Sequence, residues 1–224
     1  MLSKQFKKPV LWSFYLSSCS WRVRLALNLK NIDFKYQAVD LLNKAEGDQF
    51  SSEFTKLNPK QEVPVLLIDG HYLTQSIPII EYLNETREGI NFIPNDPVKR
   101  AKARIISEII NSGIQPHQNA NVLKRIKNEM GKEKTKEWLK FYLEKGLYSV
   151  ESILKETKGK YCINNEITIA DLCLVPQVYA ALRYKINFNN FPYIQEVYSN
   201  LENLPEFVKS HPDNQIDSVL KQKK

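Results

Sequence analysis

Apolar positions along the first 88 residues follow two alternating patterns. Short apolar or alternating runs typical of β-strands occupy residues 10–15, 34–39, 63–68 and 71–73, and helical spacing occupies residues 20–30, 49–57 and a stretch that begins at Ser76. The dipeptide Asp69-Gly70 favours a two-residue hairpin turn between the last two strands. The predicted order is therefore β-α-β-α-β-β-α, in which a helix connects the first two strands and the last two pair antiparallel.

The pattern beyond residue 88 is helical throughout. Asp96-Pro97 marks the first helix start, because Asp is a favoured N-cap and a proline in the first turn loses no hydrogen bond. Helices are expected near residues 97–129, 132–156, 168–183 and 191–209, and Gly113 and Pro116 are expected to kink or break the first of them. The chain is thus predicted to fold as an α/β domain over residues 1–88 and an all-α bundle over residues 94–224.

One helix start in the second domain is marked by a specific sequence motif. Thr168-Ile169-Ala170-Asp171 matches the capping-box pattern, and Ile167 is placed to pack on Leu172. We expect a buried helix to begin at Thr168, and we expect Asp171 to serve folding rather than chemistry.

The composition is that of a globular protein, with 42% hydrophobic and 25% charged residues. The net charge of +7 is compatible with nucleic-acid binding, but basic residues are interspersed with acidic ones, which is typical of solvated helix faces. The uncompensated basic run is Lys221-Gln222-Lys223-Lys224. We therefore expect no nucleic-acid partner, and we expect the positive field to favour a small anionic substrate.

Several features predict a cytoplasmic protein. No stretch approaches the roughly 18 consecutive apolar residues that a membrane span needs, and residues 1–8 lack an apolar signal region. Three cysteines, Cys19, Cys162 and Cys173, form no CxxC pair, which argues against a disulfide framework. We expect a reducing compartment and no membrane partner.

Metal and nucleotide sites are not expected. His71, His117 and His211 lie far apart without ligand spacing, and none neighbours a cysteine. With 7 glycines, the chain has no GxGxxG motif and no phosphate-binding loop.

Hydroxyl and thiol side chains gather at the start of the first helix. The segment Ser17-Ser18-Cys19-Ser20-Trp21-Arg22 precedes and opens this helix, whose first turn offers free N–H groups and a partial positive charge. Such a site stabilises an anion. The alternative is ordinary N-capping by one serine, although three donors in a row exceed what a cap needs.

Cys19 stands where a thiol-disulfide oxidoreductase places its nucleophile. Arg22 occupies the position that a CxxC motif gives to its second cysteine, which argues against dithiol chemistry. A buried, unreactive Cys19 is the alternative.

Two further positions are candidates for ligand binding. Val63-Pro64 opens a strand after a loop, where a cis bond would let Val63 present its backbone to a ligand, although a plain edge-strand proline explains it equally. At Gln75-Ser76, the Ser76 hydroxyl and the helix N–H groups suit a carboxylate and Gln75 offers an amide, although simple capping explains Ser76 by itself.

These residues carry a family resemblance. The octapeptide Ser17-Ser18-Cys19-Ser20-Trp21-Arg22-Val23-Arg24 resembles the signature of the zeta-class glutathione transferases, the maleylacetoacetate isomerases. Similar segments run along nearly the whole chain: residues 57–59, 61–64, 75–76, 79–83, 113–116, 118–119 and 170–178. The octapeptide and the Gln115-Pro116 segment are the parts specific to the zeta class.

The resemblance implies a thioredoxin-like N-terminal domain that binds the cofactor glutathione, a helical domain that shapes the acceptor site, and a homodimer. Ser17, Ser18 and Cys19 would surround the sulfur as the catalytic residues. The residues expected to bind glutathione are Ser17, Ser18, Cys19, Ser20, Trp21, Arg22, Gln49, Val63, Pro64, Gln75, Ser76, Gln115, Asn119, Ala120 and Asn121. Within that set, Gln49 and Val63 would contact the peptide backbone, and Gln75-Ser76 the γ-glutamyl end.

The implied activity is the cis/trans isomerisation of maleylacetoacetate to fumarylacetoacetate, a step of tyrosine and phenylalanine catabolism. Rotation about a conjugated C=C bond requires its double-bond character to be removed for a time, which reversible addition of a thiolate achieves. Arg22 and Arg183 are candidate clamps for the carboxylates of the substrate, with surface or structural roles as the alternative. Two other functions stay open: a transferase or dehalogenase acting on small α-halo acids, and a non-catalytic assembly module.

Overall fold

The computed structural model describes residues 8–42 and 47–219. The basic run at residues 221–224 and the N-terminal residues 1–7 lie outside the described residues. The described chain forms two compact units, one of residues 8–90 with 205–219 and one of residues 91–204. The first boundary lies close to the predicted one. The segment from Pro205, which the sequence pattern assigned to the helical domain, belongs to the first unit instead.

The first unit has the predicted order of strands and helices, which is confirmed. In chain order its elements are β1 (Val10–Ser13), α1 (Ser18–Leu29), β2 (Lys35–Ala38), the short 3-10 helix η1 (Asp48–Phe50), α2 (Ser52–Leu57), β3 (Val65–Ile68), β4 (His71–Thr74), α3 (Ser76–Thr86), α8 (Pro205–Ser210) and the 3-10 helix η4 (Pro212–Asn214).

The four strands form one mixed sheet in the order β2-β1-β3-β4. β1 pairs in parallel with β2 and antiparallel with β3, so that Leu11 lies opposite Tyr36 on one side and Leu66 on the other. β3 and β4 form the predicted hairpin across Asp69-Gly70. A parallel pair needs a crossover connection, and α1 supplies it.

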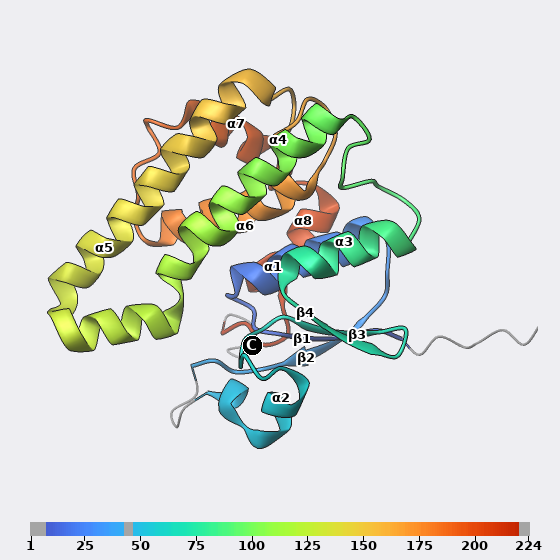
Figure 1. The fold of residues 1–224 in the computed structure, drawn as a ribbon, viewed down its shortest axis with the longest axis vertical. Coiled ribbons are helices and arrows are strands. Elements are labelled where there is room, and N and C mark those ends of the chain that lie inside the picture. The colour runs from blue at the N-terminus through green and yellow to red at the C-terminus, as the bar shows by residue number, and fades with distance from the viewer. Residues whose placement is uncertain (1–7, 43–46, 220–224) are drawn as a thin grey trace, which may run out of the picture. The chain divides into compact units, whose positions relative to one another are not determined.

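Helices cover both faces of the sheet: α1 and α3 lie on one face and α2 on the other (Figure 1). On the α2 side, Phe14, Tyr15, Phe54, Val63 and Val65 form a buried apolar cluster. The turn between β1 and α1 is therefore anchored by side chains that belong to the core.

The carboxyl-terminal segment (residues 205–219) joins the first unit through buried polar contacts with α1. Asn28 donates a 2.7 Å hydrogen bond to the hydroxyl of Ser210, and the Arg24 Nε–H donates to the carbonyl of Ser210 at 3.1 Å. Both α1 side chains are buried, so they need partners inside the fold. Helix periodicity cannot reveal this attachment, because the partners are more than 180 residues apart in the chain.

The second unit is all helical, as predicted. Its elements are α4 (Pro97–Glu108), the π-helical turn η2 (Ile109–Ile114), the 3-10 helix η3 (Gln115–Gln118), α5 (Ala120–Thr157), α6 (Ile169–Arg183) and α7 (Pro192–Leu201). The Asp96 carboxylate caps α4 by accepting from the Lys99 N–H at 2.8 Å. The expected break near Gly113 and Pro116 takes the form of η2 and η3, and Gly131, with φ of 85°, interrupts α5.

Helix α6 is the buried helix of this unit, and it begins with the predicted capping box. Asp171 accepts hydrogen bonds from the backbone N–H and the hydroxyl of Thr168, at 2.7 and 3.0 Å, and from the Cys162 N–H at 2.8 Å. Burial raises the pKa of Asp171, and these hydrogen bonds act in the opposite direction.

The last predicted helix, residues 191–209, is two helices in the structure. α7 ends at Leu201 and α8 begins at Pro205, and the two belong to different units. Within the described residues, no helix combines the length and the apolar character needed to cross a membrane.

Candidate active site

The turn between β1 and α1 positions the first candidate residues. Ser17 is the N-cap of α1, with extended backbone, and its hydroxyl oxygen accepts a 3.1 Å hydrogen bond from the Ser20 N–H. The Ser17 N–H in turn donates to the Phe14 carbonyl at 3.0 Å. Ser17 is therefore a cap, as the alternative proposed, and its hydroxyl hydrogen is still available to donate to an anion.

The first turn of α1 presents further donors beside Ser17. Among the described residues, the backbone N–H groups of Ser18 and Cys19 have no hydrogen-bond partner, because they precede the first intrahelical bond. The side chains of Ser17, Ser18 and Cys19 are all half-buried. Hydroxyl, thiol and N–H groups thus converge on one helix end, where the helix dipole also favours negative charge.

The next three residues of the signature turn inward. Ser20 and Arg22 are fully buried and Trp21 is 2% exposed, with its indole ring edge-on to His211 at 5.2 Å between centroids. Their side chains thus line the interior behind the helix start, whereas Ser17, Ser18 and Cys19 remain partly accessible.

Arg22 connects the helix start to a second candidate position. Its Nη1 donates a 3.2 Å hydrogen bond to the hydroxyl of Ser76, and both side chains are buried. Ser76 begins α3, but its hydroxyl does not cap the helix; it accepts from Arg22 instead. The simple capping explanation of Ser76 is therefore wrong.

The start of α3 has an unusual backbone and no side-chain cap. Gln75 is the N-cap residue with φ of 67°, a conformation uncommon for a non-glycine residue and often found at functional sites. Its side chain is exposed, so its amide is free to meet a ligand. Among the described residues, the backbone N–H groups of Ser76 and Ile77 have no partner, which makes this helix end suitable for a carboxylate.

Val63 and Gln49 complete the candidate residues of the first unit. The Val63-Pro64 peptide bond is cis, as the sequence allowed. Neither backbone polar group of Val63 has a hydrogen-bond partner within the described part of the chain. Gln49 in η1 is 4% exposed, and its Oε1 has no partner among the described residues.

The helical unit contributes the remaining predicted positions. Gln115 is half-buried in η3, and Asn119 is the N-cap of α5, where its Oδ1 accepts from the Asn121 N–H at 2.9 Å. Ala120 and Asn121 are exposed at the helix start. Asn119 thus has a capping role within its own unit, and its amide N–H groups remain as donors.

Two contacts that fix this segment were not predicted. Gln118 and Gln177 exchange hydrogen bonds through their amides, at 3.2 and 3.1 Å, which ties η3 to the buried face of α6. His117 stacks on Tyr142 of α5 with 3.5 Å between ring centroids and 9° between planes. Gln115 and Asn119 are therefore flanked by anchored neighbours. Each pair joins residues from different elements, which local sequence patterns cannot reveal.

Arg183 is the last residue of α6 and is exposed. A cation in the last turn of a helix is favoured by the helix dipole in any protein. Its exposure also leaves the guanidinium available to a carboxylate.

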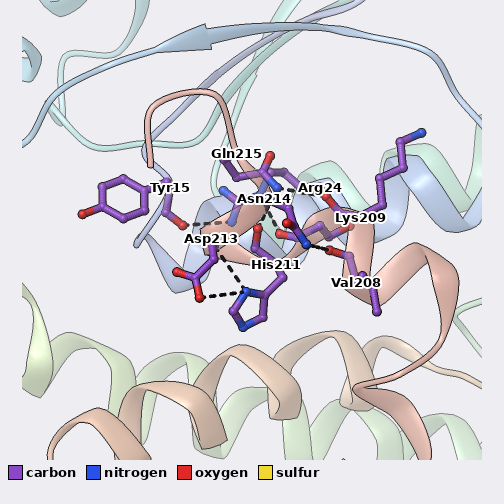
Figure 2. A network of polar contacts seen from close by, with 9 residues as sticks. Tyr15, Arg24, Val208, Lys209, His211, Asp213, Asn214 and Gln215 are labelled. Carbon is purple, nitrogen blue, oxygen red and sulfur yellow. Dashed lines mark hydrogen bonds and ion pairs between the residues drawn. The ribbon is translucent and has the colours of Figure 1, made fainter. Parts of the chain in front are cut away.

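A polar network behind the β1–α1 turn was also missed. Arg24 is fully buried and donates to the hydroxyl of Ser13 and to the carbonyls of Phe14, Tyr15 and Ser210. Figure 2 shows its contact with Tyr15 beside the folded segment around His211 and Gln215. Burial lowers the pKa of Arg24 to about 10, and the charge of Asp217 acts in the opposite direction.

Glutathione offers a thiol, two peptide groups, two carboxylates and an amino group, and the first unit has groups that fit them. The α1 start suits a thiolate, the Val63 backbone suits a peptide, and the α3 start suits a carboxylate. The unpartnered Gln49 Oε1 is one further acceptor. Among the described residues, no cluster of three or more His, Cys, Asp or Glu side chains is arranged to hold a metal.

Comparisons with known proteins agree with this geometry. Family models for the N-terminal and the C-terminal domain of glutathione S-transferase match residues 16–86 and 117–212. Maleylacetoacetate isomerase of Mus musculus is 46% identical over 214 residues, which are 96% of this chain and 97% of that protein. The protein of the same name from Dictyostelium discoideum is 42% identical over 212 residues, covering 94% and 96% of the two chains.

Solved structures give the same result. The maleylacetoacetate isomerase of Anaeromyxobacter dehalogenans with glutathione bound in its active site matches with a TM-score of 0.85 and 36% identity, over 94% of this chain and 98% of that one. A maleyl pyruvate isomerase described as a bacterial zeta-class glutathione S-transferase matches with a TM-score of 0.89 and 31% identity, over 94% and 100% of the chains. This chain therefore belongs to the glutathione S-transferase family, in the zeta-class group that includes the maleylacetoacetate isomerases.

Proposed function

We propose that this protein catalyses the glutathione-dependent cis/trans isomerisation of maleylacetoacetate to fumarylacetoacetate. The observation that carries the proposal is the start of α1, where the Ser17 hydroxyl and the N–H groups of Ser18 and Cys19 converge. Relatives that bear the isomerase name support the choice of substrate.

The chemistry needs a nucleophile that adds reversibly to an electron-poor alkene, and bound glutathione supplies it as a thiolate. The protein stabilises the negative charge of this thiolate. Ser17 is the main donor, because its oxygen already accepts from the Ser20 N–H, which orients the hydroxyl and leaves its hydrogen for the anion. Ser18 and Cys19 support it through their backbone N–H groups and side chains.

The rest of the first unit holds the ends of the peptide. Ser76 and Gln75 bind the γ-glutamyl end, and the backbone of Val63 pairs with the central peptide. Arg22 holds Ser76 in place through its hydrogen bond to the Ser76 hydroxyl. We therefore assign Arg22 to glutathione binding rather than to binding of the acceptor substrate. Gln49 adds its amide, and Pro64 shapes the strand start.

The helical unit provides the acceptor side. The substrate is a dicarboxylate at neutral pH, and the exposed Arg183 clamps one carboxylate. The same unit also contributes residues that bind glutathione, from the segment that Gln118 and His117 anchor: Gln115, Asn119, Ala120 and Asn121. We further propose that the enzyme is a cytoplasmic homodimer that serves tyrosine and phenylalanine catabolism.

The test is turnover of maleylacetoacetate with and without glutathione, followed beside dehalogenation of a small α-halo acid. We expect isomerisation that depends fully on glutathione and is faster than dehalogenation. Turnover without glutathione would refute the mechanism, and dehalogenation alone would make the protein a dehalogenase. Failure to bind immobilised glutathione would indicate a non-catalytic module.

A further inference from the structure

The peptide groups of Tyr15 are held by side chains rather than by the sheet. β1 ends at Ser13, so the backbone of Tyr15 lies outside the ladder and only two residues before Ser17. Its N–H donates to Asp217 Oδ2 at 3.0 Å, and its carbonyl accepts from Arg24 Nη2 at 3.0 Å. The two peptide units that flank the Tyr15 Cα are thus each held by a charged side chain, a carboxylate on one side and a guanidinium on the other, and such hydrogen bonds are the stronger class.

Asp217 also binds β2. Its Oδ1 accepts a 2.8 Å hydrogen bond from the hydroxyl of Tyr36, which lies opposite Leu11 of β1. One carboxylate therefore bridges the β1–α1 turn and the edge strand of the sheet.

The carboxyl-terminal segment is folded so that Asp217 reaches this position. The Gln215 amide donates to the carbonyls of Lys209 and His211, at 3.0 and 2.8 Å, and the Ser218 N–H donates to the Gln215 carbonyl at 3.2 Å. Figure 2 shows the Gln215 side chain within this turn. Arg24, which donates to the Tyr15 carbonyl, also donates to the Ser210 carbonyl. It therefore binds both the β1–α1 turn and the carboxyl-terminal segment.

The side chain of Tyr15 is held by packing, separately from the hydrogen bonds of its backbone. The Tyr15 ring is 7% exposed and contacts the Phe14 ring edge-on at 4.8 Å between centroids. Burial of the ring fixes the side chain of Tyr15, whereas the orientations of the two peptide units that flank Tyr15 set the path of the backbone toward Ser17. That path decides where the Ser17 hydroxyl and the first N–H groups of α1 point.

We infer that Asp217 is a positioning residue for the thiolate site, holding the β1–α1 turn so that Ser17, Ser18 and Cys19 face the glutathione sulfur. The inference rests on the proposed function. Asp217 lies outside both segments that the family models match, 16–86 and 117–212, and nothing in its sequence neighbourhood indicates a role in chemistry.

The test compares Asp217→Ala and Asp217→Asn with the matched control Asp213→Asn. Asp213 lies in the same segment, and its carboxylate is 3.7 Å from His211 Nδ1 rather than at the turn. For each variant we would measure kcat, KM for maleylacetoacetate, the pH profile of kcat/KM and Tm. Thiolate absorbance would give the thiol pKa of bound glutathione. Tyr36→Phe is a milder fourth variant, because it removes one donor to Asp217 and leaves the Tyr15 bond.

For Asp217→Ala we expect kcat to fall about tenfold, because small displacements of catalytic groups are costly. The acid limb of the pH profile and the thiol pKa of bound glutathione should both move to higher pH, with KM for maleylacetoacetate within about twofold of wild type. Asp217→Asn and Tyr36→Phe should show smaller changes in the same direction, since a partner for Tyr15 remains, and Asp213→Asn should match wild type.

A lower Tm in the Asp217 variants with an unchanged pH profile and thiol pKa would overturn the inference, because it indicates a purely structural role. If Asp217→Ala does not fold, unchanged values in Asp217→Asn and Tyr36→Phe would overturn it equally. Absence of turnover in the wild type would refute the proposed function instead, and the thiol pKa of bound glutathione would still decide whether Asp217 positions the site.

Discussion

The buried guanidinium of Arg22 donates a 3.2 Å hydrogen bond to the hydroxyl of Ser76, and this bond joins the starts of α1 and α3. The first residue of α3 is thus bonded to the second turn of α1, which connects two helix ends that present N–H groups to a ligand. A change at one end is expected to reach the other.

Ser76→Ala tests that connection. The substitution removes the acceptor of a buried Arg22 donor, so we expect the free energy of unfolding to fall by about 1–3 kcal/mol and KM for glutathione to rise more than KM for maleylacetoacetate. Ser107→Ala is the control, because Ser107 is as buried as Ser76 and its hydroxyl, within the described part of the chain, bonds the Ala103 carbonyl of its own helix. Equal effects of the two substitutions on glutathione would contradict the assignment of Ser76.

Arg183→Ala tests the acceptor side. Loss of the exposed guanidinium should raise KM for the dicarboxylate and leave glutathione affinity alone, since Arg183 is assigned to the substrate only. Steady-state kinetics with each ligand varied in turn will separate the two constants. Arg183→Lys should restore part of the loss, and weaker glutathione binding in the Ala variant would refute the assignment.

Asp171→Ala is expected to damage folding rather than chemistry. The buried carboxylate accepts three hydrogen bonds, and its removal leaves the N–H groups of Cys162 and Thr168 without acceptors. We expect a loss of about 3 kcal/mol in urea denaturation, against about 1 kcal/mol for removal of the exposed cap in Asp96→Ala. Normal stability with lost turnover would show that Asp171 has a direct part in catalysis.

His117 makes stability depend on pH. Burial lowers the pKa of His117 below its ordinary value of about 6.5, so as pH falls the unfolded chain takes up the proton first and the folded state loses stability. We expect urea denaturation to give a larger difference between pH 7.5 and pH 5.5 for the wild type than for His117→Phe. Tyr142→Phe keeps the stacked ring and should retain the wild-type difference; an equal pH dependence of His117→Phe and wild type would contradict this account.

Local patterns were sufficient for the order of the elements. The β-α-β-α-β-β-α order, the Asp96 cap and the Thr168 capping box are determined by residues near one another in the chain, and all are found in the structure. The first helix was predicted over residues 20–30 and is found at Ser18–Leu29, with Ser17 as the capping serine that the sequence offered as an alternative.

Contacts between distant residues were not predictable from the sequence. Arg24 lies within the family signature, but its partner Ser210 is 186 residues away, and Tyr15 and Asp217 are 202 residues apart. Residues 205–219 follow the helical pattern in sequence but group with the first unit in the structure, because helical spacing does not reveal which unit a helix packs on. Ser76 was proposed as a ligand for a carboxylate, with simple capping as the alternative, and only the structure reveals its bond to the buried Arg22.

The central claim is that the start of α1 holds a thiolate, and its most direct test is a titration of bound glutathione. The thiolate absorbance of the complex is followed against pH for wild type, Ser17→Ala and Asp96→Ala, the last removing a helix cap on α4. An unperturbed thiol has a pKa of about 8.5. We predict a lower thiol pKa in the wild-type and Asp96→Ala complexes and a rise of about one pH unit in Ser17→Ala, as expected for loss of a hydrogen bond to an anion. A wild-type complex that titrates like free glutathione would contradict the account.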